Sequence, residues 1–231
     1  LHVRRYGFHG TSHRFVSKRT AEFLGKKPEE LRIITCHLGN GSSLCAVDHG
    51  KCVDTSMGIT PLEGVIMGTR SGSMDPAVVE YICNNEHLTV SEMLNICNKK
   101  SGLLGISGVS NDMRDVDNAA KAGNERAQLA RDMLVYGIRK YIGAYAAAMN
   151  GVDAIVFTAG IGENNYKLRE DVMQGFEYMG AKLDVEKNAE LAWPNVHEAV
   201  ISAADSKVQI LVIPTNEEIA IARDTLELVT K

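Results

Sequence analysis

The sequence lacks the features that mark several broad classes of protein. No stretch approaches the roughly 20 uninterrupted apolar residues of a membrane-spanning helix, and the first ten residues, LHVRRYGFHG, lack the apolar centre of a signal peptide. Neither sign of charge is in large excess, since 25 Lys and Arg stand against 29 Asp and Glu, a net charge of -4. This balance gives no global electrostatic reason to bind nucleic acid or an anionic membrane, so we expect neither as a partner.

Cysteine is scarce and unpatterned. The five cysteines form an odd-numbered set without a CxxC pair, which is typical of reduced thiols rather than of a disulfide framework. We therefore expect a cytoplasmic location. A zinc site is disfavoured, because His9 and His13 have the i,i+4 spacing of a zinc helix but no glutamate follows His9.

The composition is that of an ordinary globular protein. With 231 residues, 45% of them hydrophobic, the chain can bury a sizeable core without a disulfide or metal. One large domain or two small ones would fit this length.

The order of sequence patterns predicts an α/β fold. Thr11 or Ser12 can cap a helix that ends near Leu24. Short β-branched segments and buried apolar runs predict five strands, the last two parallel, at residues 32–36, 43–47, 51–56, 154–160 and 208–214. Periodic patterns predict further helices at residues 76–84, 90–98 and 125–149. Together they predict a mixed five-stranded sheet flanked by helices.

Two glycine-rich segments could bind phosphate. Residues 38–43 (LGNGSS) lie between predicted strands, and residues 159–165 (AGIGENN) follow a predicted buried strand, where open α/β sheets usually place their ligands. Each alone is equally consistent with a simple turn, but together they favour a nucleotide and could meet in space. Neither matches GxxxxGK[ST] or completes GxGxxG, which disfavours Walker and Rossmann sites.

Charged residues accompany these loops. Arg70 has small neighbours that leave its guanidinium able to hold a carboxylate or phosphoryl group, and a surface salt bridge is the alternative. Asp112 and Arg114 could grip a ribose or base, although a helix N-cap explains Asp112 equally well.

Two further residues have similar alternatives. Glu217 and its neighbour follow a predicted strand, so a carboxylate could face Mg²⁺ or could simply begin a helix. His9 is flanked by glycine and could donate a hydrogen bond to developing phosphoryl charge, whereas a structural role is the usual one for a single histidine.

Six motifs in succession resemble acetate kinase and extend over most of the chain. They are RRYGFHGTSH (4–13), HLGNGSS (37–43), MGTRSGSMDP (67–76), SGVSNDMRD (107–115), FTAGIGENN (157–165) and PTNEEIAIARDT (214–225). The resemblance implies the actin-like ATPase (ribonuclease H-like) fold. It also implies homodimers and ATP- and magnesium-dependent phosphorylation of acetate to acetyl phosphate.

The resemblance also implies roles for single residues. His9 matches the histidine that stabilises the transferring phosphoryl group, and Arg70 matches the arginine that binds substrate and transition state. Glu217 resembles the magnesium-linked glutamate, and Pro61 matches a proline in the pocket for the acetate methyl group. The nucleotide-binding residues implied in the phosphate loop, the adenosine pocket and the adenine-binding loop are His37, Asn40, Gly41, Asp112, Arg114, Gly160, Ile161 and Asn164.

The sequence departs from the resemblance at its beginning. Acetate kinases carry a further N-terminal domain that nothing in this chain matches, so we expect a fragment that is inactive alone. Residues 1–10 would join that absent domain, and residues 11–231 would form the nucleotide-binding kinase domain. A propionate or butyrate kinase and a non-catalytic actin-like nucleotide-binding module are the alternatives.

Overall fold

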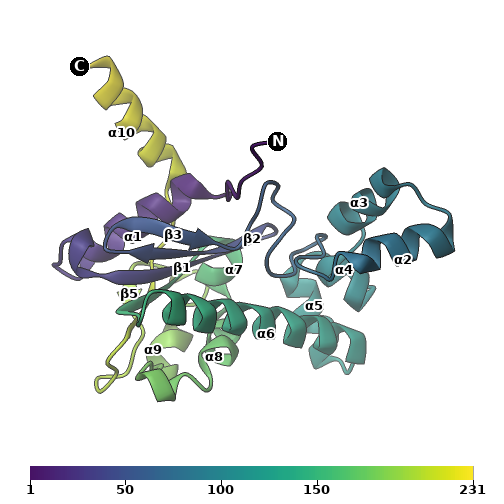
Figure 1. Ribbon diagram of the computed structural model, residues 1–231. Coiled ribbons are helices and arrows are strands. Elements are labelled where there is room, and N and C mark those ends of the chain that lie inside the picture. The colour runs from purple at the N-terminus through teal and green to yellow at the C-terminus, as the bar shows by residue number, and fades with distance from the viewer. Residues whose placement is uncertain (231) are drawn as a thin grey trace. The chain divides into compact units, whose positions relative to one another are not determined.

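The computed structural model describes residues 1–230, which form two compact units (Figure 1). The first unit comprises Leu1–Gly7, Gly39–Ser42 and Ser56–Ile138. The second comprises Phe8–Leu38, Ser43–Thr55 and the described chain from Arg139 onward.

A six-stranded sheet in the order β3-β2-β1-β4-β6-β5 forms the centre of the second unit. Its strands are β1 (Arg32–Leu38), β2 (Ser42–Asp48), β3 (Lys51–Thr55), β4 (Ala154–Thr158), β5 (Ala199–Val200) and β6 (Gln209–Val212). The predicted α/β class and mixed sheet are confirmed, but the predicted number of strands is wrong by one. The missed strand, β5, has two residues, too few to show an alternating pattern.

The middle of the sheet is parallel and buried on both faces. β1 pairs with β4 and β4 with β6 in parallel, and all five residues of β4 are buried. Helix α1 (Gly10–Phe23) contributes Val16 and Ala21 to the core cluster that covers one face. The alternate residues of β4, Ile155 and Phe157, are also fully buried. A strand that is apolar on both faces is what the continuous run AIVFT predicts.

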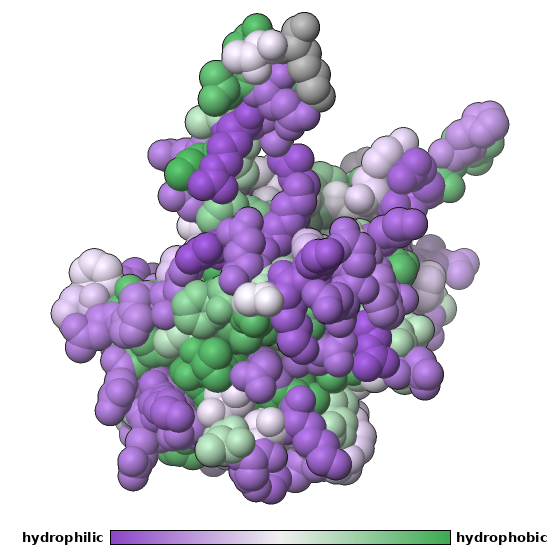
Figure 2. Space-filling model, turned by 90° about the vertical axis from the view of Figure 1, so that its left-hand side faces the viewer, coloured by the Kyte–Doolittle hydropathy of each residue, from purple (hydrophilic) through white to green (hydrophobic). Residues whose placement is uncertain are grey.

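The remaining helices of the second unit follow β4 and β6. They are α7 (Ala159–Asn164), α8 (Tyr166–Met173), α9 (Val185–Glu190) and α10 (Glu217–Val229), with the 3-10 turn η2 (Glu177–Met179) after α8. A second 3-10 turn, η1 (Pro28–Glu30), precedes β1, and the last part of a longer helix, α6 (Glu125–Ala148), also belongs to this unit. In Figure 1, α8 and α9 lie on the side of the sheet away from α1, and α10 projects from it. Exposed apolar residues of α10, among them Leu226 and Leu228, agree with this projection, which carries both hydrophilic and hydrophobic residues in Figure 2.

The first unit is helical. Its helices are α2 (Ala77–Glu86), α3 (Val90–Lys99), α4 (Gly102–Ser107), α5 (Met113–Lys121) and the first part of α6 (Glu125–Ala148). Their buried side chains include Met93, Cys97, Leu103 and Leu134. Of the helices in residues 1–230, none is long and apolar enough to cross a membrane.

Candidate functional site

The carboxyl ends of β1, β4 and β6 reach the same edge of the sheet, because these strands run parallel. His37 of β1 lies opposite Thr158 of β4, and Phe157 lies opposite Val212 of β6. Ligands of open α/β sheets bind outside this edge. It is here that the second unit places His37, the segment after β4 and the start of α10.

The segment after β4 is a short helix, which corrects the expectation of a glycine loop. Helix α7 begins at Ala159, whose φ of 63° lies in the left-handed region. Gly160 is exposed, and a Cβ added there would meet nothing within 4 Å. Asn164 donates a hydrogen bond from Nδ2 to the Gly160 carbonyl at 2.8 Å. Glycine at this position is therefore not required by the packing of the described residues.

Glu163 ties together the segments that follow β4 and β6. Its Oε1 accepts hydrogen bonds from the backbone N–H of Ala159 at 2.7 Å and of Thr215 at 3.1 Å. A carboxylate that accepts two backbone N–H groups fixes both chain segments at once. The sequence did not single out this residue, because a glutamate within a glycine-rich segment has no distinctive pattern.

Three histidines gather at the start of α1 and the end of β1. The His9 and His37 rings stack at 3.9 Å between centroids with an interplanar angle of 14°, and the His13 ring lies 6.4 Å from His9 and 6.1 Å from His37. Ser43 Oγ is hydrogen-bonded both to His9 Nδ1 and to His13 Nε2, each at 2.8 Å. Ser12 Oγ is hydrogen-bonded to His37 Nδ1 at 2.8 Å.

Burial keeps two of these histidines neutral. Burial, followed by the effects of the nearby His37 and His9, lowers the pKa of His13 from 6.5 to about 3. Burial, followed by the effect of His9, lowers the pKa of His37 to about 3 as well. At neutral pH both rings are therefore hydrogen-bonding groups without charge. His9 is half-buried, at the surface of the cluster.

A fully buried arginine binds the backbone at the end of helix α7. Arg169 of α8 is 0% exposed. Among the described residues, none of its hydrogen-bond acceptors is a carboxylate. Its guanidinium donates five hydrogen bonds, to the carbonyls of Gly162, Glu163, Asn188 and Leu191 and to Asn188 Oδ1. Burial lowers its pKa from 12.5 to about 10, so it remains charged at neutral pH and holds the end of α7 in place.

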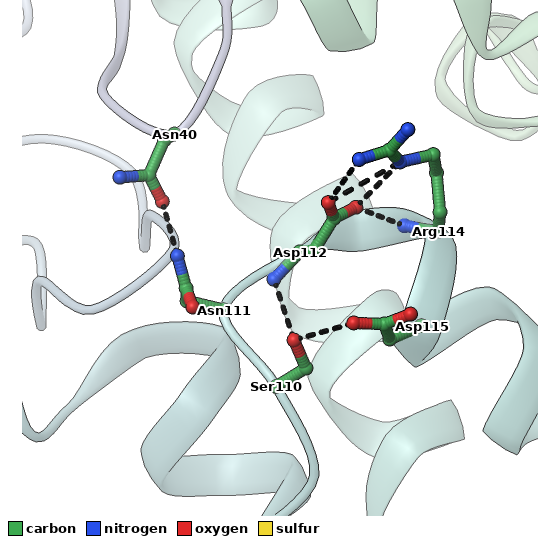
Figure 3. Close-up of polar contacts among 6 residues, drawn as sticks. All are labelled: Asn40, Ser110, Asn111, Asp112, Arg114 and Asp115. Carbon is green, nitrogen blue, oxygen red and sulfur yellow. Dashed lines mark hydrogen bonds and ion pairs between the residues drawn. The ribbon is translucent and has the colours of Figure 1, made fainter.

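In the first unit, the predicted phosphate loop forms a tight turn. Gly39 N–H donates to the Gly41 carbonyl at 3.1 Å, and Ser42 Oγ donates to the Gly39 carbonyl at 2.9 Å. Asn40 accepts a bond on its carbonyl from Gly68 N–H at 3.1 Å. Figure 3 shows its side chain also accepting from Asn111 Nδ2 at 3.1 Å. The structure thus brings Asn40 beside the segment that contains Asp112 and Arg114.

Asp112 has the role of a helix N-cap. It accepts a hydrogen bond from Arg114 N–H at 2.9 Å at the start of α5, and it forms an ion pair with the Arg114 guanidinium (Figure 3). The hydrogen bond from the Arg114 side chain is the main cause that lowers the Asp112 pKa. The Arg114 side chain is 87% exposed, so it can exchange its partner for a ligand at little cost.

Arg70 differs from this pair, because the hydrogen bonds of its guanidinium go to a carbonyl and a sulfur atom rather than to a carboxylate. Its Nη1 donates to the Pro61 carbonyl at 3.3 Å and contacts Met67 Sδ at 3.5 Å. Among residues 1–230, no acidic side chain forms an ion pair with this half-buried guanidinium, so the surface salt bridge considered as the alternative does not form. The structure therefore brings together Arg70 and Pro61, the two predicted acetate-site residues.

Glu217 does not belong to a closed metal site of several side chains within the described residues. Glu217 is the exposed first residue of α10, and Asn216 caps this helix by accepting a bond from Ile219 N–H. Within the described residues, no group of three or more His, Cys, Asp and Glu side chains could hold a metal ion. Mg²⁺ at phosphoryl-transfer sites needs only one or two carboxylates besides phosphate oxygens and water.

The predicted residues thus fall into two sets, one in each unit. Residues 9, 37, 160, 161, 164 and 217 belong to the second unit, and residues 40, 41, 61, 70, 112 and 114 belong to the first. The two glycine segments that could meet in space lie in different units. Ser12, Ser43, Glu163 and Arg169 were missed, and of these only Arg169 lay outside the motifs that carried the resemblance.

Known proteins resemble the chain over nearly its whole length. Acetate kinase of Thermotoga petrophila is 61% identical over 230 residues, which cover 99% of this chain and 57% of that protein. Acetate kinase of Acetivibrio thermocellus is 59% identical over 227 residues, 98% of this chain and 56% of that protein. The chain therefore spans little more than half the length of these relatives.

Solved structures show the same resemblance. The crystal structure of Porphyromonas gingivalis acetate kinase has a TM-score of 0.95 and 52% identity, and the match covers 98% of this chain and 56% of that one. A propionate kinase from Francisella tularensis has a TM-score of 0.88 and 43% identity, covering 96% of this chain and 55% of that one. The sequence matches the acetokinase family over residues 1–223, and the chain belongs to this family.

Proposed function

We propose that this chain supplies the nucleotide-binding and carboxylate-binding residues of an acetate kinase, which transfers the γ-phosphoryl group of ATP to acetate and releases acetyl phosphate and ADP. The observation that carries the proposal is the guanidinium of Arg70, which contacts the Pro61 carbonyl and the Met67 sulfur and, among residues 1–230, forms no ion pair with an acidic side chain. Such a group can bind an anionic oxygen pair with two parallel hydrogen bonds.

The reaction places most of its demands on positioning. In an in-line transfer the charge of the transition state spreads over the equatorial phosphoryl oxygens, so fixed donors and cations provide most of the rate gain. Arg70 would orient the acetate carboxylate, and Pro61 would face the methyl group. His9 would donate to the transferring phosphoryl group, and its ring is already oriented by Ser43 and by stacking on His37. Bound Mg²⁺, for which Glu217 is the proposed ligand, would neutralise charge on the phosphates.

Each unit carries residues that we assign to the nucleotide. In the second unit, open space beside Gly160 leaves room for an adenine ring to approach the backbone of α7, next to Ile161 and Asn164. His37 of the second unit would contact phosphate. In the first unit, the Asp112–Arg114 pair would contact the adenosine, and the turn at Asn40 and Gly41 would contact phosphate.

Other parts of the proposal concern the whole protein. They are a homodimer, Mg²⁺ as cofactor, a cytoplasmic location, and ATP or ADP with acetate or acetyl phosphate as the partners, without nucleic acid or membrane. Residues 1–10 would join a further N-terminal domain and residues 11–231 would form the nucleotide-binding domain. The chain alone would then bind ATP in a calorimetric titration but form no acetyl phosphate, and full turnover by the chain alone would contradict this assignment.

The test of the carboxylate role uses Arg70→Ala in the complete protein. Loss of one oxyanion-type donor typically costs about 10²- to 10³-fold in kcat, so acetyl hydroxamate formation should fall by at least that factor. Arg126→Ala is the matched control, because Arg126, like Arg70, donates to backbone carbonyls, here those of Ile106 and Gly105, and has no proposed catalytic role. An Arg70→Ala enzyme with unchanged kcat would refute the proposal.

A propionate kinase is the second candidate, favoured by the likeness to the Francisella tularensis propionate kinase. One additional methylene in an apolar pocket changes discrimination by only about 10- to 200-fold. Comparing kcat/KM for acetate, propionate and butyrate in the complete protein separates these candidates. Tight ATP binding without transfer to any of the three acids would instead favour a non-catalytic module.

A further inference from the structure

The β2–β3 hairpin brings two cysteines into contact. Cys45 of β2 and Cys52 of β3 have their sulfur atoms 3.3 Å apart. Cys45 is 3% exposed and forms part of the core cluster, whereas Cys52 is exposed on β3, an edge strand of the sheet. One thiol of the pair is thus open to solvent and the other is buried behind it.

An irregularity in the hairpin creates this contact. Cys45 pairs with Thr55, but Val47 pairs with Cys52, so the register shifts by one residue between Ala46 and Val47. Since side chains alternate between faces, a shift of one residue moves the following side chains to the other face. Cys52 therefore lies on the same face as Cys45 and Val47, diagonally across from Cys45, rather than on the opposite face.

The two thiols also differ in acidity. The hydrogen bond with Cys45 lowers the pKa of Cys52 from 9.0 to about 7, whereas the same bond and burial raise the pKa of Cys45. A thiolate is the reactive form of cysteine, and exposure controls its access to oxidants. Elsewhere in the described chain, Cys36 and Cys97 are buried and Cys83 is half-buried. Cys52 is therefore the thiol that meets an oxidant first, with Cys45 next to it.

We propose that Cys45 and Cys52 form a reversible intramolecular disulfide when the protein meets a hydroperoxide. The Cys52 thiolate attacks the peroxide oxygen, the O–O bond breaks, and Cys52 becomes a sulfenic acid while the peroxide leaves as water or an alcohol. The Cys45 sulfur then attacks the Cys52 sulfur, so that an S–S bond forms, the S–O bond breaks and water leaves with the Cys45 proton. Two thiols are oxidised by two electrons and one peroxide is reduced.

The second step requires only a small movement of the two sulfur atoms. An S–S bond is about 2.05 Å long, so the sulfurs, 3.3 Å apart in the reduced protein, need to approach by only about 1.2 Å. The bulge already interrupts the regular ladder at this point, where the backbone can adjust. A dithiol reductant would restore both thiols by exchange.

Mass spectrometry of the whole chain tests the proposal. The reduced chain is treated with an equimolar amount of hydrogen peroxide, remaining thiols are alkylated, and the protein is digested with trypsin. Cleavage after Lys51 separates Cys45, in residues 33–51, from Cys52, in residues 52–70. We expect these two peptides to be joined in the oxidised sample, two hydrogens lighter than their sum, and to separate after treatment with dithiothreitol. Fragmentation assigns the bond to Cys45 rather than to Cys36 in the first peptide.

Variants decide whether the order of reaction is correct. Cys52→Ser should abolish the joined peptides, and Cys83→Ser, the control, should leave them unchanged. Cys45→Ser should accumulate sulfenic acid at Cys52, which dimedone labels; near-ultraviolet circular dichroism confirms that each variant is folded. The proposal is overturned if wild-type Cys52 is oxidised without joining Cys45, or if the peptides still join in folded Cys52→Ser or Cys45→Ser protein.

Discussion

Acid should destabilise the second unit through its two buried histidines. His13 and His37 are 4% and 7% exposed, and the pKa of each is lowered from 6.5 to about 3 in the folded chain. The unfolded chain therefore binds protons at a pH where the folded chain does not. The stabilisation is complete above pH 6.5 and is lost progressively as the pH falls below this value toward 3.

The size of the loss in folding stability follows from the shift in the histidine pKa. One pKa unit corresponds to about 1.4 kcal/mol, so at pH 5 each histidine costs about 2 kcal/mol and the two together about 4 kcal/mol relative to pH 8. This is a large part of the roughly 5–15 kcal/mol that stabilises a typical domain. Carboxylates in ion pairs, such as Asp153 and Glu198, have a lowered pKa and stay ionised in this range, so the interval from pH 8 to 5 isolates the histidines.

Urea denaturation followed by circular dichroism at pH 8, 7, 6 and 5 measures this loss. The loss between pH 6 and pH 5 should be about 2–3 kcal/mol and should fall by about half in His13→Gln. His197→Gln, at the exposed His197, is the control and should keep the wild-type loss. Equal stability at pH 8 and pH 5, or an unchanged loss in His13→Gln, would refute the reasoning.

Three other substitutions should change the free energy of unfolding. Arg169→Met removes five buried hydrogen bonds and should cost about 3–5 kcal/mol in urea denaturation, whereas a loss below about 1 kcal/mol would show that the carbonyls find other donors. Gly102→Ala should cost more than about 2 kcal/mol, because φ is +60° and the new Cβ would collide with the Met67 carbonyl and lie 2.7 Å from that of Arg70. Gly143→Ala, within α6 and with open space around it, should instead raise stability by up to about 1 kcal/mol, and a lower melting temperature would contradict this.

The sequence predicted the long elements closely, because their signals are local. The expected helix at residues 90–98 is α3 (Val90–Lys99), and the expected helix at residues 125–149 is α6 (Glu125–Ala148). The turn before β3 was also predictable, because glycine is typical of two-residue hairpin loops. In the structure, His49 and Gly50 form this loop and both have positive φ. Helices α4, α7 and α9 were missed, because six residues hold too few periods to show a pattern.

The candidate site was predictable as a set of residues but not as a set of contacts. The sequence left two possible roles for Arg70 and two for Asp112, and only their contacts in the folded chain separate these alternatives. Among the described residues, Arg70 forms no ion pair with an acidic side chain. Asp112 caps the N-terminus of α5. Neither role can be predicted from the neighbouring sequence, because each role depends on which side chains folding brings close to the residue. The same reason explains Arg169, whose acceptors include residues on α9 and just beyond it.

The carboxylate of Glu163 couples two amides that are far apart along the chain. It accepts from the N–H groups of both Ala159 and Thr215, so any local opening that displaces it exposes both to solvent deuterium together. Their exchange rates should therefore rise and fall in step. The start of α7 and the segment after β6 then form a single cooperative element, and a ligand that slows the local opening of one also slows that of the other.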